Sequence, residues 1–165
     1  MTINNNCNIF SIRTAVISDI PELKTLYKTT VLTINREDYS AEEVEDWASC
    51  GDNDAHWNEL LIEQHCIVAE NKKNEIVGFT SINDEGYMHM MFVHKDFQGQ
   101  GIATLLYQTL EEYAIKKDAK QITSEVSITA KLFFEKQGFV VNEEQKRKAN
   151  KLQLVNYKMS KQLQQ

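Results

Sequence analysis

Residues 91–106 decide the fold of this chain, and they read Met91-Phe92-Val93-His94-Lys95-Asp96-Phe97-Gln98-Gly99-Gln100-Gly101-Ile102-Ala103-Thr104-Leu105-Leu106. An apolar run ends at Val93, two glycines follow, and an apolar-periodic segment begins at Ile102. This order predicts a strand, a glycine-rich loop and a helix. The first N–H groups of a helix lack partners within it and lie at the positive end of its dipole, so the loop suits a phosphate or pyrophosphate. Gly99 and Gly101 keep side chains out of that approach.

A second segment follows downstream and reads Ser127-Ile128-Thr129-Ala130-Lys131-Leu132-Phe133-Phe134-Glu135-Lys136-Gln137-Gly138-Phe139. Together the two segments resemble the GNAT superfamily of acetyl-CoA-dependent N-acetyltransferases, and the resemblance runs from about Ile9 to Met159. In that family a Gln/Arg-x-x-Gly-x-Gly/Ala loop holds the CoA pyrophosphate. Gln98, Gly101 and Ala103 fall on the fixed positions of this loop.

The second segment matches the family's Asn-x-x-Ala-x-x-Phe-Tyr-x-x-x-Gly-Phe pattern in part. The positions that it keeps are Ala130, Phe133, Gly138 and Phe139. Ser127 stands where the family has Asn, and by resemblance it replaces the amide that grips the pantetheine arm of CoA. Phe134 stands where the family usually has Tyr, and this departure removes the usual proton donor to the departing thiol.

The resemblance implies an α/β (α+β) fold: a mixed central β-sheet with helices on both faces and a splayed pair of strands at the CoA site. A single domain over residues 1–165 is expected, with acetyl-CoA as co-substrate. Backbone groups of the strand before the loop would meet the pantetheine and the thioester carbonyl, which places Val93 in the catalytic set. The cofactor-binding residues that the resemblance implies are Met91, Phe92, Val93, Gln98, Gly99, Gln100, Gly101, Ile102, Ala103, Thr104, Ser127 and Phe134.

Acetyl transfer to an amine also needs a proton acceptor, because an amine with a pKa near ~10.4 is mostly protonated at neutral pH. Residues 87, 89, 91 and 93 are expected to share one face of their strand, since side chains alternate along a strand. GNAT enzymes often carry their base there, and His89 titrates in the useful range. His89 is therefore the first candidate base and Glu85 the second. The alternative is a half-exposed sheet histidine bonded to a neighbour.

The proton donor is open. A general acid typically contributes ~10²–10⁴-fold in rate, but a thiol with a pKa near ~8.5 is a tolerable leaving group without one. Tyr87, Tyr107, Tyr157 or solvent are the candidates that replace the missing tyrosine hydroxyl.

The composition is that of an ordinary globular domain, with 42% apolar and 25% charged residues among 165. No apolar run approaches the ~20 residues that span a bilayer, and residues 1–6 lack a signal-peptide pattern, so a cytoplasmic protein without membrane contact is expected. A net charge of −6 argues against nucleic acid as the main partner. Cys7, Cys50 and Cys66 lack metal-ligand spacing, so free thiols and no metal are expected.

Negative charge is concentrated between Thr33 and Glu63, where ten acidic residues accompany one base, Arg36. One interpretation is a solvated helix face; the other is an acidic wall that attracts a cationic acceptor. The same stretch contains Tyr39, Trp47 and Trp57, which are candidates for the walls of an acceptor pocket because aromatic faces favour cations.

Periodicity and turn residues predict the order β-α-α-β-β-β-α-β-α-β-β, which matches the GNAT fold. Ser18 or Asp19 is the expected N-cap of the first helix, and the second begins at the capping box that starts with Ser40. The predicted strands are 8–15, 66–70, 76–82, 87–93, 121–126, 139–143 and 152–159, and the predicted later helices are 56–63, 102–117 and 129–137.

These patterns predict an N-acetyltransferase that moves the acetyl group of acetyl-CoA directly to a primary amine in a ternary complex. The expected acceptor is a small cationic amine or a peptide amine. The alternative is a non-catalytic acyl-CoA-binding sensor or interaction module, which the loss of tyrosine at Phe134 keeps open. A homodimer is expected to pair through the final strand from Leu152, since GNAT domains often associate through sheet edges or C-terminal strands.

Overall fold

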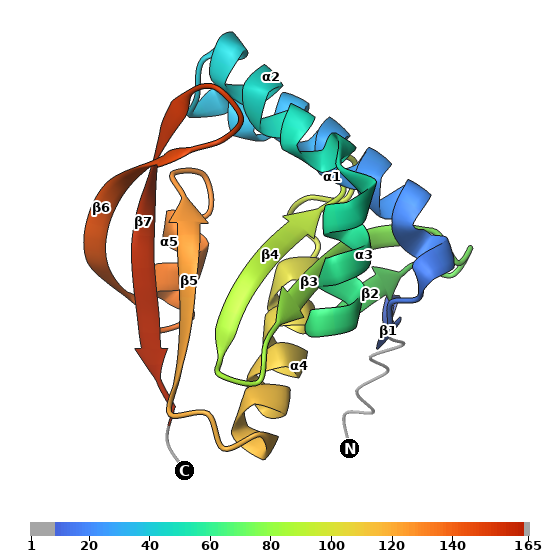
Figure 1. The fold of residues 1–165 in the computed structure, drawn as a ribbon. Coiled ribbons are helices and arrows are strands. Elements are labelled where there is room, and N and C mark those ends of the chain that lie inside the picture. The colour runs from blue at the N-terminus through green and yellow to red at the C-terminus, as the bar shows by residue number, and fades with distance from the viewer. Residues whose placement is uncertain (1–8, 164–165) are drawn as a thin grey trace.

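The computed structural model describes residues 9–163. Within them, one mixed sheet has the strand order β1-β2-β3-β4-β5-β7-β6 (Figure 1). Its strands are β1 (Ser11–Thr14), β2 (His65–Glu70), β3 (Ile76–Ile82), β4 (Tyr87–Val93), β5 (Gln121–Ser127), β6 (Val140–Lys148) and β7 (Gln153–Gln162). The α-helices are α1 (Ile20–Thr33), α2 (Ala41–Ser49), α3 (Asp54–Glu63), α4 (Ile102–Lys116) and α5 (Lys131–Lys136). The predicted α/β class and mixed central sheet are confirmed.

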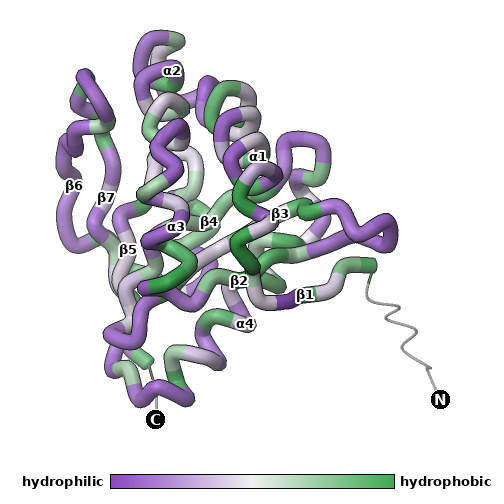
Figure 2. Tube along the Cα trace, turned by 45° about the vertical axis from the view of Figure 1, so that its right-hand side comes forward, coloured by the Kyte–Doolittle hydropathy of each residue, from purple (hydrophilic) through white to green (hydrophobic). Residues whose placement is uncertain are grey.

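Helices cover both faces of the sheet, and each face has its own hydrophobic cluster. On one face α1, α2 and α3 bury residues such as Leu23, Val44 and Trp57 against Phe79 of β3. On the other face α4 and α5 bury residues such as Leu106 against the opposite side of the same strands. In Figure 2 the apolar stretches of the chain lie mainly on the central strands and on the helix turns that pack against them.

The first two helices begin differently from one another. Ser40 caps α2 with a capping box, as predicted: its hydroxyl accepts the Glu43 N–H at 3.1 Å. Asp19 occupies the N-cap position of α1, as predicted, but its side chain makes no cap hydrogen bond there. Its carboxylate instead binds the Arg13 guanidinium and the Val16 N–H. Arg13 is the stronger partner because it is a cation with two donors in place.

Strand β4 contains a β-bulge at His89. Met88 pairs with Ile82 and Met90 with Ser81, so His89 is one residue extra on β4. A bulge shifts the alternation of side chains, and the expectation that residues 87, 89, 91 and 93 share one face is therefore wrong. Met91 and Val93 pack toward the α4 face, whereas the His89 ring meets His56 of α3 on the other face.

Strands β4 and β5 separate immediately after they pair. Their parallel ladder contains only Tyr87↔Thr123 and Met88↔Ser124 among the described residues. Beyond those pairs the two strands diverge, which divides the sheet into a β1–β4 half and a β5–β7 half with an opening between them (Figure 1). The splayed strand pair that the resemblance implied is thus present, and the bulge at His89 lies where the separation begins.

Tyr39 connects the helices that cover the β1–β4 half to the β5–β7 half. Its hydroxyl donates to the Val155 carbonyl at 2.7 Å and accepts the Ile128 N–H at 2.9 Å. Burial raises the pKa of Tyr39 to about 12, so the hydroxyl stays protonated and keeps donating. Tyr39 therefore holds the connection between α1 and α2 against β7 and against the chain that follows β5.

Asp46 of α2 fixes the turn between β6 and β7. Its carboxylate accepts the N–H groups of Asn150, Lys151 and Leu152 at 3.1, 2.9 and 2.9 Å. Hydrogen bonds from the Leu152 and Lys151 N–H groups lower the pKa of Asp46, since they favour its charged form. One of the ten acids between Thr33 and Glu63 thus has an anchoring role.

Strand β7 does not form an edge of the sheet. It lies between β5 and β6, so the prediction that the final strand pairs with a second copy is wrong for this topology. The edge strands are β1 and β6. Strand β6 is longer than the predicted 139–143, because it pairs with β7 from Val140 as far as Lys148.

Candidate active site

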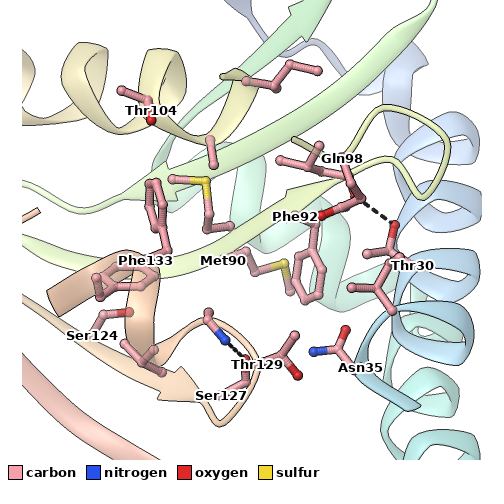
Figure 3. A pocket seen from close by; sticks show the side chains of 18 of the residues that line it. Thr30, Asn35, Met90, Phe92, Gln98, Thr104, Ser124, Ser127, Thr129 and Phe133 are labelled. Carbon is pink, nitrogen blue, oxygen red and sulfur yellow. Dashed lines mark hydrogen bonds between the residues drawn. The ribbon is translucent and has the colours of Figure 1, made fainter. Parts of the chain in front are cut away.

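A cavity of about 480 Å³ opens where β4 and β5 separate (Figure 3). Its walls come from the end of β4, the glycine loop, the start of α4, the end of β5 and the chain leading into α5. The end of α1 and Asn35 of the following 3-10 turn close it from the side. The strand divergence therefore creates the space, and the loop and α4 supply one of its ends.

The glycine loop presents open backbone to this cavity. Gly99 and Gly101 have φ angles of +73° and +81°, a region that glycine enters without steric cost. A Cβ placed on either residue would meet no heavy atom within 4 Å, so the space beside the loop is free. The Leu105 N–H bonds the Gly101 carbonyl at 3.0 Å, which marks the first turn of α4. The N–H groups of that turn are therefore left for an anion.

Gln98 lines the cavity but uses its side chain to hold the loop. Its amide donates to the Val93 carbonyl at 2.7 Å and approaches the His94 carbonyl at 3.4 Å. The Thr30 hydroxyl donates to the same Val93 carbonyl at 3.2 Å. The side chain of Gln98 thus joins the loop to the end of β4. It contributes to anion binding by positioning the loop. Gln100, in contrast, does not line the cavity.

The wall formed by β4 offers backbone groups. The His94 N–H donates to the Val77 carbonyl at 2.8 Å, and bonded pairs alternate with non-bonded pairs along an antiparallel ladder. Met91 and Val93 fall in non-bonded pairs with Thr80 and Gly78, so their backbone groups face the opening. Phe92 falls in a bonded pair and meets the cavity with its side chain.

The opposite wall carries the hydroxyl groups of Ser124, Ser127 and Thr129, of which that of Ser124 donates to the Met88 carbonyl at 2.8 Å. The Ser127 hydroxyl accepts the Ala130 N–H at 3.1 Å (Figure 3). The Thr129 hydroxyl is buried without a hydrogen-bond partner in the described structure. A buried hydroxyl without a partner is costly, so Thr129 is a candidate to bond a ligand in this cavity. Sequence reasoning missed Thr129, because it occupies a variable position of the motif.

Phe134 lines the cavity and is buried, with its ring edge-on to Phe133 and Phe139 at 5.5 and 5.0 Å. It supplies an apolar surface and no proton. None of the three tyrosines considered as substitutes lines the cavity. Phe134 therefore contributes packing at this position and leaves the protonation of the thiol to another group.

These walls fit acetyl-CoA. A helix N-terminus and an open glycine loop suit the pyrophosphate. Backbone groups of Met91 and the Val93 N–H can pair with the pantetheine amides as a strand would, whereas the Val93 carbonyl is already bonded to Gln98 and Thr30. The unpartnered Thr129 hydroxyl lies on the facing wall. Thr104 adds a hydroxyl at the start of α4 (Figure 3).

His89 lines the cavity and touches a second histidine. Its Nε2 lies 3.4 Å from Nε2 of His56 on α3, with ring centroids 5.6 Å apart. Burial lowers the pKa of His89 most, and the charges of His56 and Arg147 lower it further, while Glu125 raises it. His89 is therefore neutral at physiological pH, which is the state that accepts a proton. His56 belongs to no recognised motif. The bulge in β4 turns the His89 ring toward it.

Glu85 lies away from this arrangement. It is an exposed residue of the β3–β4 turn, where its N–H bonds the Asn83 side chain at 3.0 Å, and it does not line the cavity. The geometry therefore favours His89 over Glu85 as the base.

The aromatic residues expected to wall an acceptor pocket belong to the core instead. Trp57 is fully buried and its indole N–H donates to the Gly51 carbonyl at 2.9 Å. Tyr39 is buried in the bridge between the two halves, and Trp47 packs edge-on against it at 5.5 Å. None of the three lines the main cavity, so that prediction is wrong.

A second, more open cavity of about 460 Å³ lies beside α3. Polar groups line it: Ser49, Cys50, Asp52, Asn53, His56 and Asn150. His56 therefore borders the second cavity while its partner His89 borders the first. Of the acidic residues between Thr33 and Glu63, Asp52 lines this cavity, and eight of the ten are exposed.

Cys50 and Cys66 are free thiols, as predicted, and Cys7 lies outside the described residues. Among residues 9–163, no group of three or more histidine, cysteine or acidic side chains is arranged to hold a metal ion. No helix in the same range is long and apolar enough to cross a membrane.

Known proteins with matching sequences are acetyltransferases. Residues 35–161 match the family model of the acetyltransferase (GNAT) domain. The chain is also 30% identical over 139 residues to YafP of Escherichia coli strain K12, described as an uncharacterized N-acetyltransferase. That similarity covers 84% of this chain and 87% of the relative.

Solved structures share the fold. A GCN5-related N-acetyltransferase from Rhodopseudomonas palustris has a TM-score of 0.89 at 29% identity, covering 93% of this chain and 95% of that one. The PaiA N-acetyltransferase of Thermoplasma acidophilum, in complex with coenzyme A, has a TM-score of 0.77 at 16% identity, covering 93% and 99%. YncA from Salmonella typhimurium, solved with its cofactor acetyl-CoA, has a TM-score of 0.65 at 18% identity, and the match covers 94% of this chain and 95% of that one. The chain therefore belongs to the GNAT family of acetyl-CoA-dependent acetyltransferases.

Proposed function

We propose that this protein, acting as one catalytic domain, transfers the acetyl group of acetyl-CoA directly to a primary amine in a ternary complex. The observation that carries the proposal is the cavity at the β4–β5 opening. It joins open backbone groups of the glycine loop and of β4 to a neutral histidine in one continuous lining. Direct transfer fits because no cysteine or other activated nucleophile lines the cavity among the described residues.

In this reaction the amine nitrogen attacks the thioester carbonyl carbon, and a C–N bond forms as the carbonyl becomes an oxyanion. The Val93 N–H, which faces the opening, is the donor that stabilises this charge. His89 takes the proton that the ammonium or the attacking amine must lose. The C–S bond then breaks and the thiolate is protonated by solvent, since Phe134 has no hydroxyl to give.

The acceptor that we propose is a small cationic amine or a peptide amine. Among the described residues that line the main cavity, Glu125 is the acidic side chain, and Arg147 of β6, with which it forms an ion pair, does not line the cavity. Asp52 adds a carboxylate in the neighbouring cavity. Carboxylates beside the cavity favour a cationic acceptor over an anionic one.

Release of CoA thiol with a panel of amines tests this function. We expect release with polyamines, amino acids, aminoglycosides or basic peptides, and little with anionic amines such as amino-sugar phosphates. If only anionic amines react, the proposed acceptor class is wrong. The variant Glu125→Gln should raise KM for the cationic acceptor and leave KM for acetyl-CoA unchanged.

A second candidate function is a non-catalytic acyl-CoA-binding module, and Phe134 is the observation that favours it. The two functions are separated by the same measurement. Calorimetric binding of CoA without thiol release from acetyl-CoA for any amine in the panel would support the sensor and contradict the enzyme.

We also propose a homodimer, now through the edge strand β6. Antiparallel pairing of two β6 strands about a two-fold axis near Gln145 places Glu144 opposite Lys146 and Glu143 opposite Arg147. Light scattering at micromolar concentration should show a dimer, and Lys146→Glu should convert it to a monomer by placing like charges opposite one another. A wild-type monomer would contradict this pairing.

A further inference from the structure

His89 lies in a partly closed environment where a proton, once accepted, has few routes out. The groups around its ring are Tyr87 on its own strand, His56 on α3, Glu125 on β5 and Arg147 on β6. Glu125 and Arg147 form an ion pair with each other, so neither is a free acceptor. The Tyr87 ring lies 6.1 Å from that of His89, and burial raises the pKa of its hydroxyl, so it does not take protons.

His56 differs from these neighbours in two respects. Its Nε2 is within 3.4 Å of Nε2 of His89, at the outer limit of a hydrogen bond through which a proton can pass. It also borders the second, more open cavity, together with Asp52 and Asn53. The histidine pair therefore connects the cavity fitted for acetyl-CoA to a polar cavity open to water.

We propose that His56 is a proton-relay residue that acts through His89 and carries the acceptor's proton to solvent in the second cavity. The inference rests on the proposed function of His89 as the base. An N–H bond of the acceptor breaks and the proton bonds to the free ring nitrogen of His89. His89 then gives the proton on its own Nε2 to Nε2 of His56, and His56 releases its Nδ1 proton to water. One proton enters and one leaves, so no oxidant or further reactant is needed.

The geometry explains why two histidines serve better than one. Two imidazolium rings at this distance repel each other, so the pair holds one added proton rather than two. A half-buried lone imidazole would have to release its proton into the site that the acceptor occupies. With His56 present, the proton leaves on the opposite side of the ring.

A readout that does not need activity comes from NMR titration of the histidine side chains in the full chain. We expect the titration curve of His89 to change when His56 is replaced, because the two rings lie 3.4 Å apart at Nε2. His65, which stacks on Tyr113 with ring centroids 4.0 Å apart and lines neither cavity, serves as the reference. A His89 titration curve that is unchanged by the His56→Asn substitution would overturn the proposal.

The kinetic experiment compares His56→Asn with His89→Asn and with the control His65→Asn, using an amine that the wild-type enzyme acetylates. We expect His89→Asn to lower kcat by about 100-fold and His56→Asn by about 10-fold, with KM for acetyl-CoA unchanged. Added imidazole should restore kcat of His56→Asn, because a small carrier can enter the open cavity and accept the proton. It should not stimulate the wild type or His65→Asn.

The outcomes separate the relay from the function itself. No thiol release by the wild type with any amine overturns the proposed function. A large loss in His89→Asn, with unchanged kcat and no imidazole effect in His56→Asn, overturns the relay alone. A thermal unfolding temperature for His56→Asn near that of the wild type shows that a loss of kcat is not a loss of fold.

Discussion

The two sides of the cavity are built on different principles. On the cofactor side, one continuous segment, residues 91–104, supplies the backbone N–H groups of β4, the glycine loop and the first turn of α4, and Ser127 and Thr129 complete the facing wall. On the acceptor side, side chains meet from four separate elements: His56 of α3, His89 of β4, Glu125 of β5 and Arg147 of β6. The first side is local and the second depends entirely on tertiary structure.

This difference determines which substitutions each side of the cavity tolerates. A backbone site tolerates variation in most side chains but needs glycine wherever the chain adopts a positive φ or a ligand comes close. A side-chain site can be altered one residue at a time, which changes the acceptor without disturbing the cofactor. The comparison predicts that substitutions on the cofactor side abolish binding, while those on the acceptor side alter rate and selectivity.

The largest effect should come from Gly101→Glu. Its φ of +81° strains any side chain, and the open space beside the loop, which would receive the pyrophosphate, would be occupied by a carboxylate. We expect the affinity for CoA to fall by more than about 100-fold, to below detection by calorimetry, with the far-UV circular dichroism spectrum retained.

Two control variants identify the cause of that loss. Gly101→Ala carries the backbone strain without the charge and should lose less affinity than Gly101→Glu. Gln100→Glu adds the same charge one residue away, on a side chain that does not line the cavity, and should bind CoA nearly as the wild type does. Near wild-type affinity in Gly101→Glu would mean that the loop does not hold the pyrophosphate.

The same comparison shows how far the sequence predicts the structure. The strand, loop and helix at 87–116 were predictable because apolar periodicity and two glycines act over neighbouring residues. His89 was identified from its strand, but its direction was wrong, because the bulge that shifts the alternation results from pairing with β3 and leaves no local signal.

Two further contacts could not be predicted from local sequence patterns, because their partners are distant in the chain. His56 lies 33 residues before His89 and meets it only after α3 packs on the sheet. Asp46 looked like one acid among ten, yet its partners are backbone N–H groups about 100 residues away in the chain, which no pattern at α2 reveals. The acidic stretch therefore combines anchoring, cavity-lining and solvated residues that composition alone does not distinguish.

A smaller effect is expected from Tyr39→Phe, which tests the link between the two halves. The change leaves the Ile128 N–H without its acceptor and the Val155 carbonyl without its donor. Because both partners are part-buried, we expect the free energy of unfolding to fall by about 1–3 kcal/mol in urea denaturation. CoA affinity should fall as well, since Ile128 follows Ser127 in the cavity wall.

The matched control for that variant is Tyr113→Phe. The Tyr113 hydroxyl donates to Asp84 at 2.8 Å on the surface, where water replaces the lost partner. Its loss should cost only a few tenths of a kcal/mol. Equal stability of Tyr39→Phe and Tyr113→Phe would show that the two halves of the sheet are held together without Tyr39.

The smallest effect should arise far from the opening, at Asp19, which anchors the first edge strand. Hydrogen bonds from the Arg13 guanidinium lower the pKa of Asp19, and the Val16 N–H adds to this, while burial opposes it. A depressed carboxyl pKa stabilises the folded state at neutral pH, and this contribution is lost as the pH falls from about 4 through the folded pKa. The stability difference between wild type and Asp19→Asn should therefore be full at pH 7 and shrink at pH 3, as measured by urea denaturation.

The exposed Asp118→Asn should show a small difference with little pH dependence, and CoA affinity should be unchanged in both variants, because neither residue lines the cavity. A difference for Asp19→Asn that is the same at pH 7 and pH 3 would mean that its charge does not stabilise this end of the sheet.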